Sequence, residues 1–244
     1  MPVSIILAHP EISHNVGFVA RTMKCYHLPS LRIVGRKYPR HSYAYKTGCS
    51  AVDILDNTGY FKTLEGALAD CHLALGFTRR RRDELFGYTE NMLEVIPSID
   101  FSQHVALVFG RESQGLSKEE CLLADKLVQI NLPNNDQSLN ISHAVAIVLH
   151  EIFAHGLVTD NPLIQKNKQK QNKKKASKKT AVAATFHQKS EALESFMEIL
   201  QQKNVLKTSK AGAHANYIKN LWLRANPNQK EIEFLLGLIH KITK

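Results

Sequence analysis

Three short segments hold the polar residues that are best suited to chemistry, and each follows an apolar run typical of a buried strand. Each segment combines amide, carboxylate, hydroxyl or guanidinium side chains with a glycine or a helix-capping residue. The segments cover residues 10–21, 109–117 and 132–140. Taken alone, each is equally well explained as a turn followed by a helix cap. Because the carboxyl ends of parallel strands meet at one edge of a sheet, the three together predict a single ligand site.

The elements that must position these segments alternate between strand and helix patterns. Predicted strands cover residues 3–8, 31–34, 72–77, 105–110 and 127–131, and predicted helices cover 16–26, 64–69, 117–123 and 138–155. Ser117 and Ser138 are suited to cap the last two helices. This alternation predicts an α/β fold with a mostly parallel sheet flanked by helices on both faces.

A change in composition predicts three parts: a domain at residues 1–158, a flexible linker at 159–185 and a small all-helical module at 186–244. Eight lysines and no acidic residue lie within residues 161–180, so most of the net charge of +10 lies there. Such a run either contacts nucleic-acid phosphates or is only solvated. In the module, apolar residues recur with helical spacing at Leu193, Phe196, Met197 and Leu200, and at Ile232, Leu235, Leu236 and Ile239.

The middle of the helical module is expected to contain a further short helix. Tyr217, Leu221 and Trp222 would form its apolar stripe. Asn226 followed by Pro227 is typical of an N-cap and the first position of the last helix.

The overall composition, with 43% hydrophobic and 22% charged residues, is typical of a globular protein. No apolar run is long enough for a membrane span or a signal-peptide core, so we expect no membrane association. The four cysteines are scattered and form no CxxC pair, which predicts reduced thiols in the cytoplasm: Cys25, Cys49, Cys71 and Cys121.

Two apparent ligand motifs do not have the spacing that their chemistry needs. His150-Glu151 and His155 form HExxxH, in which the two histidines are ~140° apart around a helix, so we expect no metal. The segment Gly110–Gly115 lacks the Lys-Ser/Thr of a phosphate-binding loop, and no GxGxxG follows a strand. NTP and NAD binding are therefore not expected.

In order along the chain, the three segments resemble the signature motifs of the SpoU branch of the SPOUT methyltransferases. The motifs are N-x-G-x-x-x-R, F-G-x-E-x-x-G-L and S-L-N, here Asn15/Gly17/Arg21, Phe109/Gly110/Glu112/Gly115/Leu116 and Ser138/Leu139/Asn140. The resemblance covers about residues 1–157. The segment 221–239 is similar to the C-terminal extension of the TrmJ-type enzymes, which methylate the ribose 2′-oxygen of the pyrimidine at nucleotide 32 of tRNA.

The resemblance implies a fold, a cofactor and partners that periodicity alone does not indicate. The fold would include a C-terminal trefoil knot, a rare exception among proteins. The cofactor would be S-adenosylmethionine, held in the knot, and the enzyme would be a homodimer that acts on tRNA.

The resemblance also implies roles for individual residues. The catalytic set would be Arg21, Asn15, Glu112, Ser138 and Asn140, with Arg21 reaching into the partner's site. The cofactor would contact Gly76, Phe77, Thr78, Gly110, Ile130, Ser138 and Leu139. Because a guanidinium group stays protonated in proteins, we expect Arg21 to stabilise the developing alkoxide electrostatically. One segment departs from the family pattern: the run Arg79, Arg80, Arg81 and Arg82 is more basic than is usual in TrmJ-type enzymes. Because it follows a strand end on the expected site face, a contact with RNA phosphates is favoured over a solvated loop.

Other functions remain open at this stage. Ser142-His143 is similar to single-domain relatives that modify the wobble nucleotide, and ribosomal RNA is another possible substrate. A non-catalytic RNA-binding module, or an α/β protein that binds a different adenine-containing ligand, belongs to another class. The complete set of catalytic residues favours the enzyme.

Overall fold

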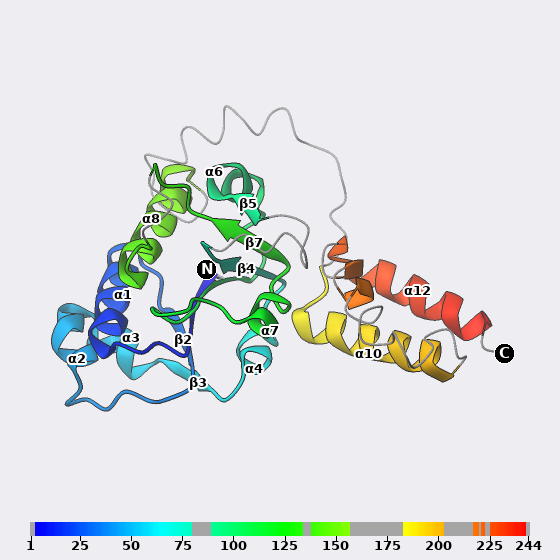
Figure 1. Ribbon diagram of the computed structural model, residues 1–244, viewed down its shortest axis with the longest axis horizontal. Helices are drawn as coiled ribbons and strands as arrows, with labels where there is room; N and C mark the ends of the chain where they lie inside the picture. The colour runs from blue at the N-terminus through cyan, green and yellow to red at the C-terminus, as the bar shows by residue number, and fades with distance from the viewer. Residues whose placement is uncertain are drawn as a thin grey trace.

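The computed structural model describes residues 3–79, 89–133, 138–156, 183–202, 217–219, 221–222 and 225–242. Its centre is a seven-stranded sheet in the order β3-β2-β1-β6-β4-β7-β5, in which all neighbouring strands are parallel (Figure 1). The strands are β1 (Val3–Ala8), β2 (Ser30–Val34), β3 (Gly59–Phe61), β4 (Leu73–Phe77), β5 (Thr89–Asn91), β6 (Val105–Phe109) and β7 (Lys126–Gln129). The predicted parallel α/β fold is confirmed.

Helices cover both faces of the sheet. Strand β1 shows why: Ile5 and Leu7 belong to one hydrophobic core, whereas Ile6 and Ala8 belong to the other. The first core is covered by α1 (Ser13–Cys25), α2 (Tyr43–Gly48), α3 (Val52–Asp56), α6 (Met92–Val95) and α8 (Ile141–Ala154). The second is covered by α4 (Leu64–Leu68), α7 (Lys118–Cys121) and the start of α10 (Phe186–Gln202). Strands buried on both faces are therefore apolar along their whole length, which made them recognisable in the sequence.

The predicted strands and helices of this domain are present, with ends displaced by up to three residues. Helix α8 begins at Ile141 and not at Ser138, because the side chain of Asn140 accepts a 2.9 Å hydrogen bond from the Ser142 N–H and caps the helix. Ser117 does cap α7, and Glu120 completes a reciprocal capping box with it. The elements that the sequence did not predict all have six residues or fewer: α2, α3, α6, β3, β5 and the 3-10 turns η1 (Cys49–Ala51) and η2 (Ile96–Ser98).

The C-terminal helices α10 and α12 (Gln229–Ile242) pack on each other, as their apolar spacing predicts. Their shared core contains Leu193, Trp222 and Ile232. The predicted stripe of the middle helix is correct only for Trp222, because Tyr217 and Leu221 are exposed.

The predicted cap of α12 was two residues too early. Asn228 is the capping residue, since its side chain accepts from the Glu231 N–H at 3.1 Å and the Glu231 carboxylate accepts from its N–H at 2.8 Å. Asn226 has a φ of +42°, outside the helical region, and its side chain accepts a hydrogen bond from Lys189.

Lys189 of α10 joins these helices to the sheet domain through a buried ion pair. Its ammonium group donates to the Asp125 carboxylate at 2.8 Å, to the His72 carbonyl at 2.9 Å and to the Asn226 side chain at 2.8 Å. Both charged side chains are at least 98% buried. Burial raises the pKa of Asp125, and the Lys189 charge opposes that shift. The start of α10 is thereby fixed against the segment before β4.

Some expectations concern residues outside those described. Residues 157–182, which contain most of the predicted linker, belong to this group, and so do residues 134–137, so the trefoil knot stays a prediction. Among the described helices, none has the length and apolar character needed to cross a bilayer.

Candidate active site

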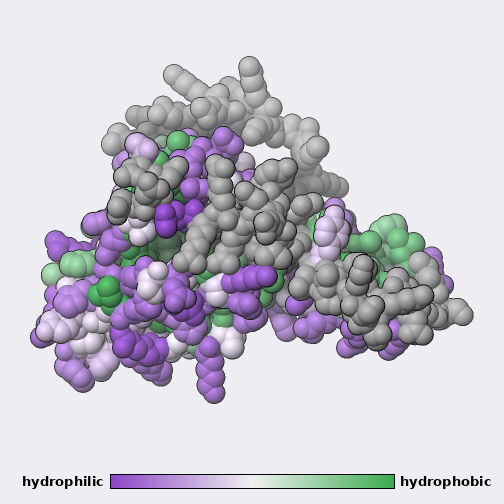
Figure 2. All heavy atoms as spheres, in the orientation of Figure 1, coloured by the Kyte–Doolittle hydropathy of each residue, from purple (hydrophilic) through white to green (hydrophobic). Residues whose placement is uncertain are grey.

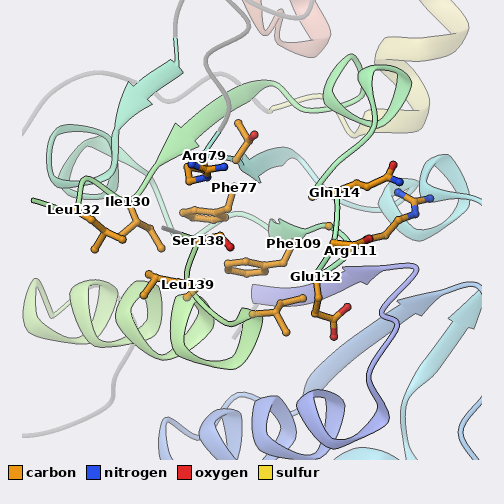
Figure 3. Close-up of a pocket in the computed structure, with 16 residues that line it drawn as sticks. Phe77, Arg79, Phe109, Arg111, Glu112, Gln114, Ile130, Leu132, Ser138 and Leu139 are labelled. Carbon is orange, nitrogen blue, oxygen red and sulfur yellow. The ribbon is translucent and has the colours of Figure 1, made fainter. Parts of the chain in front are cut away.

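The three segments predicted to carry chemistry lie at the carboxyl edge of the sheet, after β1, β6 and β7. The segments after β6 and β7, together with residues 77–79 at the end of β4, line a pocket (Figure 3). The pocket is lined by Phe77, Thr78, Arg79, Phe109, Gly110, Arg111, Glu112, Ser113, Gln114, Gly115, Ile130, Leu132, Ser138, Leu139, Ile141 and Ala144.

Two aromatic rings lie on the strand side of the pocket. Phe77 and Phe109 are register partners at the ends of β4 and β6, and their rings stack with centroids 4.7 Å apart. Ile130, Leu132 and Leu139 add aliphatic side chains (Figure 3). A largely apolar pocket with polar loops at its rim is suited to a small organic ligand.

Two glycines shape the loop that follows β6. Arg111 and Gly115 exchange backbone hydrogen bonds of 3.1 and 2.8 Å, so the chain reverses tightly between them. Gly115 has a φ of +69°, and a Cβ on Gly110 would lie 2.1 Å from the carbonyl carbon of Gly115. Only glycine fits at Gly110, and Gly115 has the backbone conformation that glycine favours.

Glu112 joins the loops after β1 and β6. One of its carboxylate oxygens accepts from the Glu11 N–H at 2.8 Å. The other accepts from the Ile12 N–H at 3.2 Å and from the Asn15 side chain at 2.8 Å. In Figure 3 its side chain points from the pocket rim toward α1. A carboxylate that accepts three hydrogen bonds holds these loops in one arrangement.

Asn140 extends this network to the third segment. Its amide N–H donates to the Asn15 side-chain oxygen at 3.0 Å, and its own oxygen accepts from the Ser142 N–H and hydroxyl. Asn15 is 3% exposed, and a buried amide needs hydrogen-bond partners. Its N–H₂ group donates to Glu112 and its oxygen accepts from Asn140. Glu112, Asn15 and Asn140 therefore form one chain of hydrogen bonds, as the three predicted segments together suggested.

Arg21 lies outside the pocket, on the exposed face of α1. It lines a groove between α1 and α8, together with Asn15, Phe18, Thr22, Cys25, Asn140, Ser142, His143 and Ala146. Its guanidinium donates to the Cys49 sulfur at 4.0 Å. Glu112 lines the pocket and Asn15 and Asn140 line the groove, so the hydrogen-bond network separates these two spaces.

Most residues predicted to contact the cofactor line the pocket: Phe77, Thr78, Gly110, Ile130, Ser138 and Leu139. Gly76 does not line it, because its α-carbon faces the opposite core, where a Cβ would meet Ala124, Leu127 and Leu116 at 3.0–3.2 Å. Successive strand residues point to opposite faces, which explains why Phe77 lines the pocket and Gly76 does not. Arg79 lines the pocket, whereas Arg80, Arg81 and Arg82 are outside the described residues.

Several lining residues were not predicted individually: Arg111, Ser113, Gln114, Leu132, Ile141 and Ala144. The first three lie in the loop after β6, which the sequence marked as a whole. Ile141 and Ala144 lie in the first turn of α8, so their position follows from the corrected start of that helix.

A second polar cluster lies at the opposite, amino edge of the sheet. Ligand atoms of Asp70, Cys71 and His104 lie within 4.8 Å of one another, as metal ligands would. The Arg32 guanidinium already bonds the Asp70 carboxylate and lowers its pKa to about 2. Burial raises the pKa of Cys71 to about 12. The Asp70 carboxylate is also 3.4 Å from His104, so these residues form an ion-pair network at this edge of the sheet.

The histidines of the HExxxH motif do not converge. His155 contacts Glu151 at 2.8 Å within α8, and His150 contacts the Tyr26 hydroxyl at 3.5 Å. Each histidine therefore has a separate partner.

Comparison with known proteins identifies the family. Residues 2–150 match the model of the SpoU rRNA methylase family. The chain belongs to the SpoU methylase family. It is therefore an RNA methyltransferase, and the enzyme class predicted from the three motifs is confirmed.

Two SpoU relatives resemble the chain over its whole length. One is the tRNA (cytidine/uridine-2′-O-)-methyltransferase TrmJ of Photorhabdus laumondii, which is 28% identical over 246 residues and covers 99% of this chain and 97% of its own. The other is the crystal structure of TrmJ from Z. mobilis ZM4, with a TM-score of 0.76, 22% identity and 99% of each chain covered. The SPOUT fold is thus shared, including the region of the C-terminal helices.

A third similar structure is the SpoU methyltransferase AviRb from Streptomyces viridochromogenes, in complex with the cofactor AdoMet. It has a TM-score of 0.51 and 17% identity, and covers 64% of this chain and 61% of its own. That structure holds AdoMet, which is the cofactor that the sequence motifs of this chain lead us to expect.

Proposed function

We propose that this chain is an S-adenosylmethionine-dependent tRNA ribose 2′-O-methyltransferase that modifies the pyrimidine at nucleotide 32. The observation that carries the proposal is the Glu112–Asn15–Asn140 network between the pocket and the groove that contains Arg21. The similarity to a tRNA 2′-O-methyltransferase over 99% of the chain favours tRNA over ribosomal RNA.

The pocket residues fit S-adenosylmethionine. Ile130, Leu132 and Leu139 offer apolar surface for the adenosine, and the loop at residues 110–115 lines the rest of the pocket. Thr78 and Ser138 would meet its polar groups. When bound, this cofactor supplies an activated methyl group.

The chain's own residues then need to align and stabilise the ribose hydroxyl. Alignment alone contributes roughly 7–11 kcal/mol in favourable cases. Arg21 would stabilise the oxygen as its charge develops, and a guanidinium is suited to the adjacent phosphate as well. Asn15, Asn140 and Glu112 would fix the loops around the nucleotide, and Ser138 would contact the ribose.

The position of Arg21 supports a homodimer in which this residue completes the partner's site. Arg21 is exposed and lines the groove between α1 and α8, separate from the pocket of its own chain. The neighbouring Ile12 and Phe18 are 46% and 42% exposed, which is typical of an interface. A second copy that covered this face would bring Arg21 to the other pocket.

Mixing two inactive variants tests this arrangement. Arg21→Ala lacks the catalytic cation, and Gly110→Ala disrupts the pocket loop. If Arg21 acts in the partner, heterodimers of the two variants combine one intact pocket with one intact arginine and regain part of the activity. Activity that stays absent in verified heterodimers would contradict action between subunits, and a monomer by light scattering would contradict the dimer.

The central test incubates the protein with unmodified tRNA transcripts and labelled S-adenosylmethionine, followed by nuclease digestion and mass spectrometry. We expect a 2′-O-methyl group at nucleotide 32 that is absent with Arg21→Ala. Methylation of nucleotide 34 or of ribosomal RNA would assign a different substrate to the same chemistry. RNA binding without transfer to any RNA would favour a non-catalytic module.

We propose a cytoplasmic setting, where tRNA is available. All four cysteines are free, and two of them, Cys25 and Cys49, are exposed, which suits a reducing compartment.

A further inference from the structure

We propose that the segment between β2 and the end of α2, residues 35–48, is an RNA-binding surface that holds phosphates next to the methylated nucleotide. The inference rests on the proposed function. This segment contains Arg36, Lys37, Arg40 and Lys46 but no acidic residue. All four cations are exposed.

The charges available to a ligand are those without a carboxylate partner. Arg40 pairs with Asp56, whereas Arg36, Lys37 and Lys46 form no ion pair with any carboxylate of the described residues. Unpaired cations on one short segment are the arrangement that binds a polyphosphate backbone.

These cations are held over aromatic rings. The Arg36 guanidinium lies 5.0 Å from the ring centre of Tyr38, and the Lys37 ammonium 5.6 Å from that of Tyr60. The Lys46 ammonium lies 4.6 Å from the ring centre of Tyr43. An aromatic ring restricts a long cationic side chain without neutralising it, so its charge stays available to an anion.

The surface is attached directly to the first catalytic loop. The Arg36 side chain donates to the Glu11 carbonyl at 2.8 Å. The Tyr38 hydroxyl donates to the Pro10 carbonyl at 2.6 Å, and the Thr47 hydroxyl to the His14 carbonyl at 2.9 Å.

Helix packing adds to this attachment. A Cβ on Gly17 would lie 2.1 Å from the Thr47 hydroxyl oxygen and 2.2 Å from the Ala44 carbonyl oxygen, so α1 and α2 are in backbone contact. The cations therefore keep a fixed position relative to Asn15 and Glu112.

The same surface contains an exposed aromatic ring next to the catalytic network. Tyr43 is 52% exposed, and its ring stacks on His14 with centroids 4.2 Å apart. His14 precedes Asn15 of the catalytic network. Figure 2 shows that hydrophilic residues predominate on this part of the molecule, to the lower left. Exposed cations beside aromatic side chains are typical of surfaces that bind single-stranded RNA, such as a loop.

The experiment measures the affinity of an unmodified tRNA transcript for the wild type and for Lys37→Ala/Lys46→Ala, at several salt concentrations. These lysines donate no hydrogen bond to the described part of the fold, so cofactor affinity should stay unchanged. We expect the Kd for tRNA to rise roughly ten-fold, and the slope of log Kd against log salt to fall by about 1 for each lysine. Arg36→Ala should act in the same direction.

The double variant Lys230→Ala/Lys241→Ala removes the same charge from exposed positions on α12 and serves as the control. An unchanged Kd and slope for Lys37→Ala/Lys46→Ala, or an equal change in the control, would overturn the proposal. Absence of methyl transfer by the wild type would contradict the proposed function instead, and the comparison of affinities would still test this surface.

Discussion

Asn15 and Asn140 are joined by a 3.0 Å hydrogen bond although 125 positions separate them in the chain. Asn15 lies in the first turn of α1, and Asn140 caps α8. Each amide uses its other end as well, toward Glu112 and toward Ser142. The bond therefore couples the start of the two helices that line the groove to the carboxylate at the pocket rim.

Glu112→Gln should weaken both the fold and catalysis. A glutamine has the same shape, but its N–H₂ group would replace one of the two carboxylate oxygens and would face N–H donors that need an acceptor. Hydrogen bonds to charged groups contribute about 1.5–3 kcal/mol each. We expect the free energy of unfolding to fall by about 2 kcal/mol and methyl transfer to decline strongly. Urea unfolding and a transfer assay check this, with the exposed Glu94→Gln as control. Equal stability of the two variants would show that the network does not depend on the negative charge of Glu112.

Gly110→Ala should abolish cofactor binding. The new methyl group would overlap backbone atoms of Gly115 and Leu116, which cannot move without opening the loop. Overpacking of this kind costs about 1–3 kcal/mol. Gly237→Ala is the matched control, because nothing lies within 4 Å of its Cβ and alanine favours a helix by about 1 kcal/mol. Calorimetric titration with S-adenosylmethionine and thermal unfolding should separate them, and tight binding by Gly110→Ala would refute the assigned pocket.

Lys189→Met should destabilise the protein far more than Lys126→Met. The first change leaves the buried Asp125 carboxylate without its cation, at a cost of about 3–5 kcal/mol. The second breaks the partly exposed pair of Lys126 with Glu90, where about 0–1 kcal/mol is expected. Equilibrium unfolding in urea measures both. Losses of similar size would mean that the buried pair does not hold α10 in place.

The pair of Arg32 and Asp70 should make stability depend on acid pH. The guanidinium lowers the pKa of Asp70 from its usual value of about 3.9 to about 2 in the folded protein. Its contribution is therefore present above pH ~4 and is lost as the pH falls toward 2. Unfolding of the wild type and of Asp70→Asn between pH 5 and pH 3 should show a difference that shrinks with acid. A constant difference would argue against the shift.

The sequence predicted the parts of the fold that depend on long patterns. Strand β1 and helix α8 were recognisable because burial on both faces, or a helical period over many residues, leaves a repeated signal. Helices α2 and α3, with six and five residues, leave none. The basic surface that contains Arg36 and Lys46 was not predicted either. Its link to the first loop consists of side-chain hydrogen bonds to carbonyl groups, and these leave no pattern in the sequence.

The candidate site was predictable as a set of segments, because parallel strands end at one edge. The direction of single side chains was not. Gly76 and Phe77 differ by one position and point to opposite faces, and Arg21 lies on the groove side of α1. The direction of a side chain depends on the register of its strand or the rotation of its helix about the axis. The family motifs do not specify either.

The buried ion pair of Lys189 and Asp125 also determines where the C-terminal helices lie. It holds the start of α10 at the amino edge of the sheet, whereas the pocket opens at the carboxyl edge. Movement of α10 away from the sheet would have to separate two buried charges. The C-terminal helices are therefore anchored at the edge of the sheet that is opposite to the site.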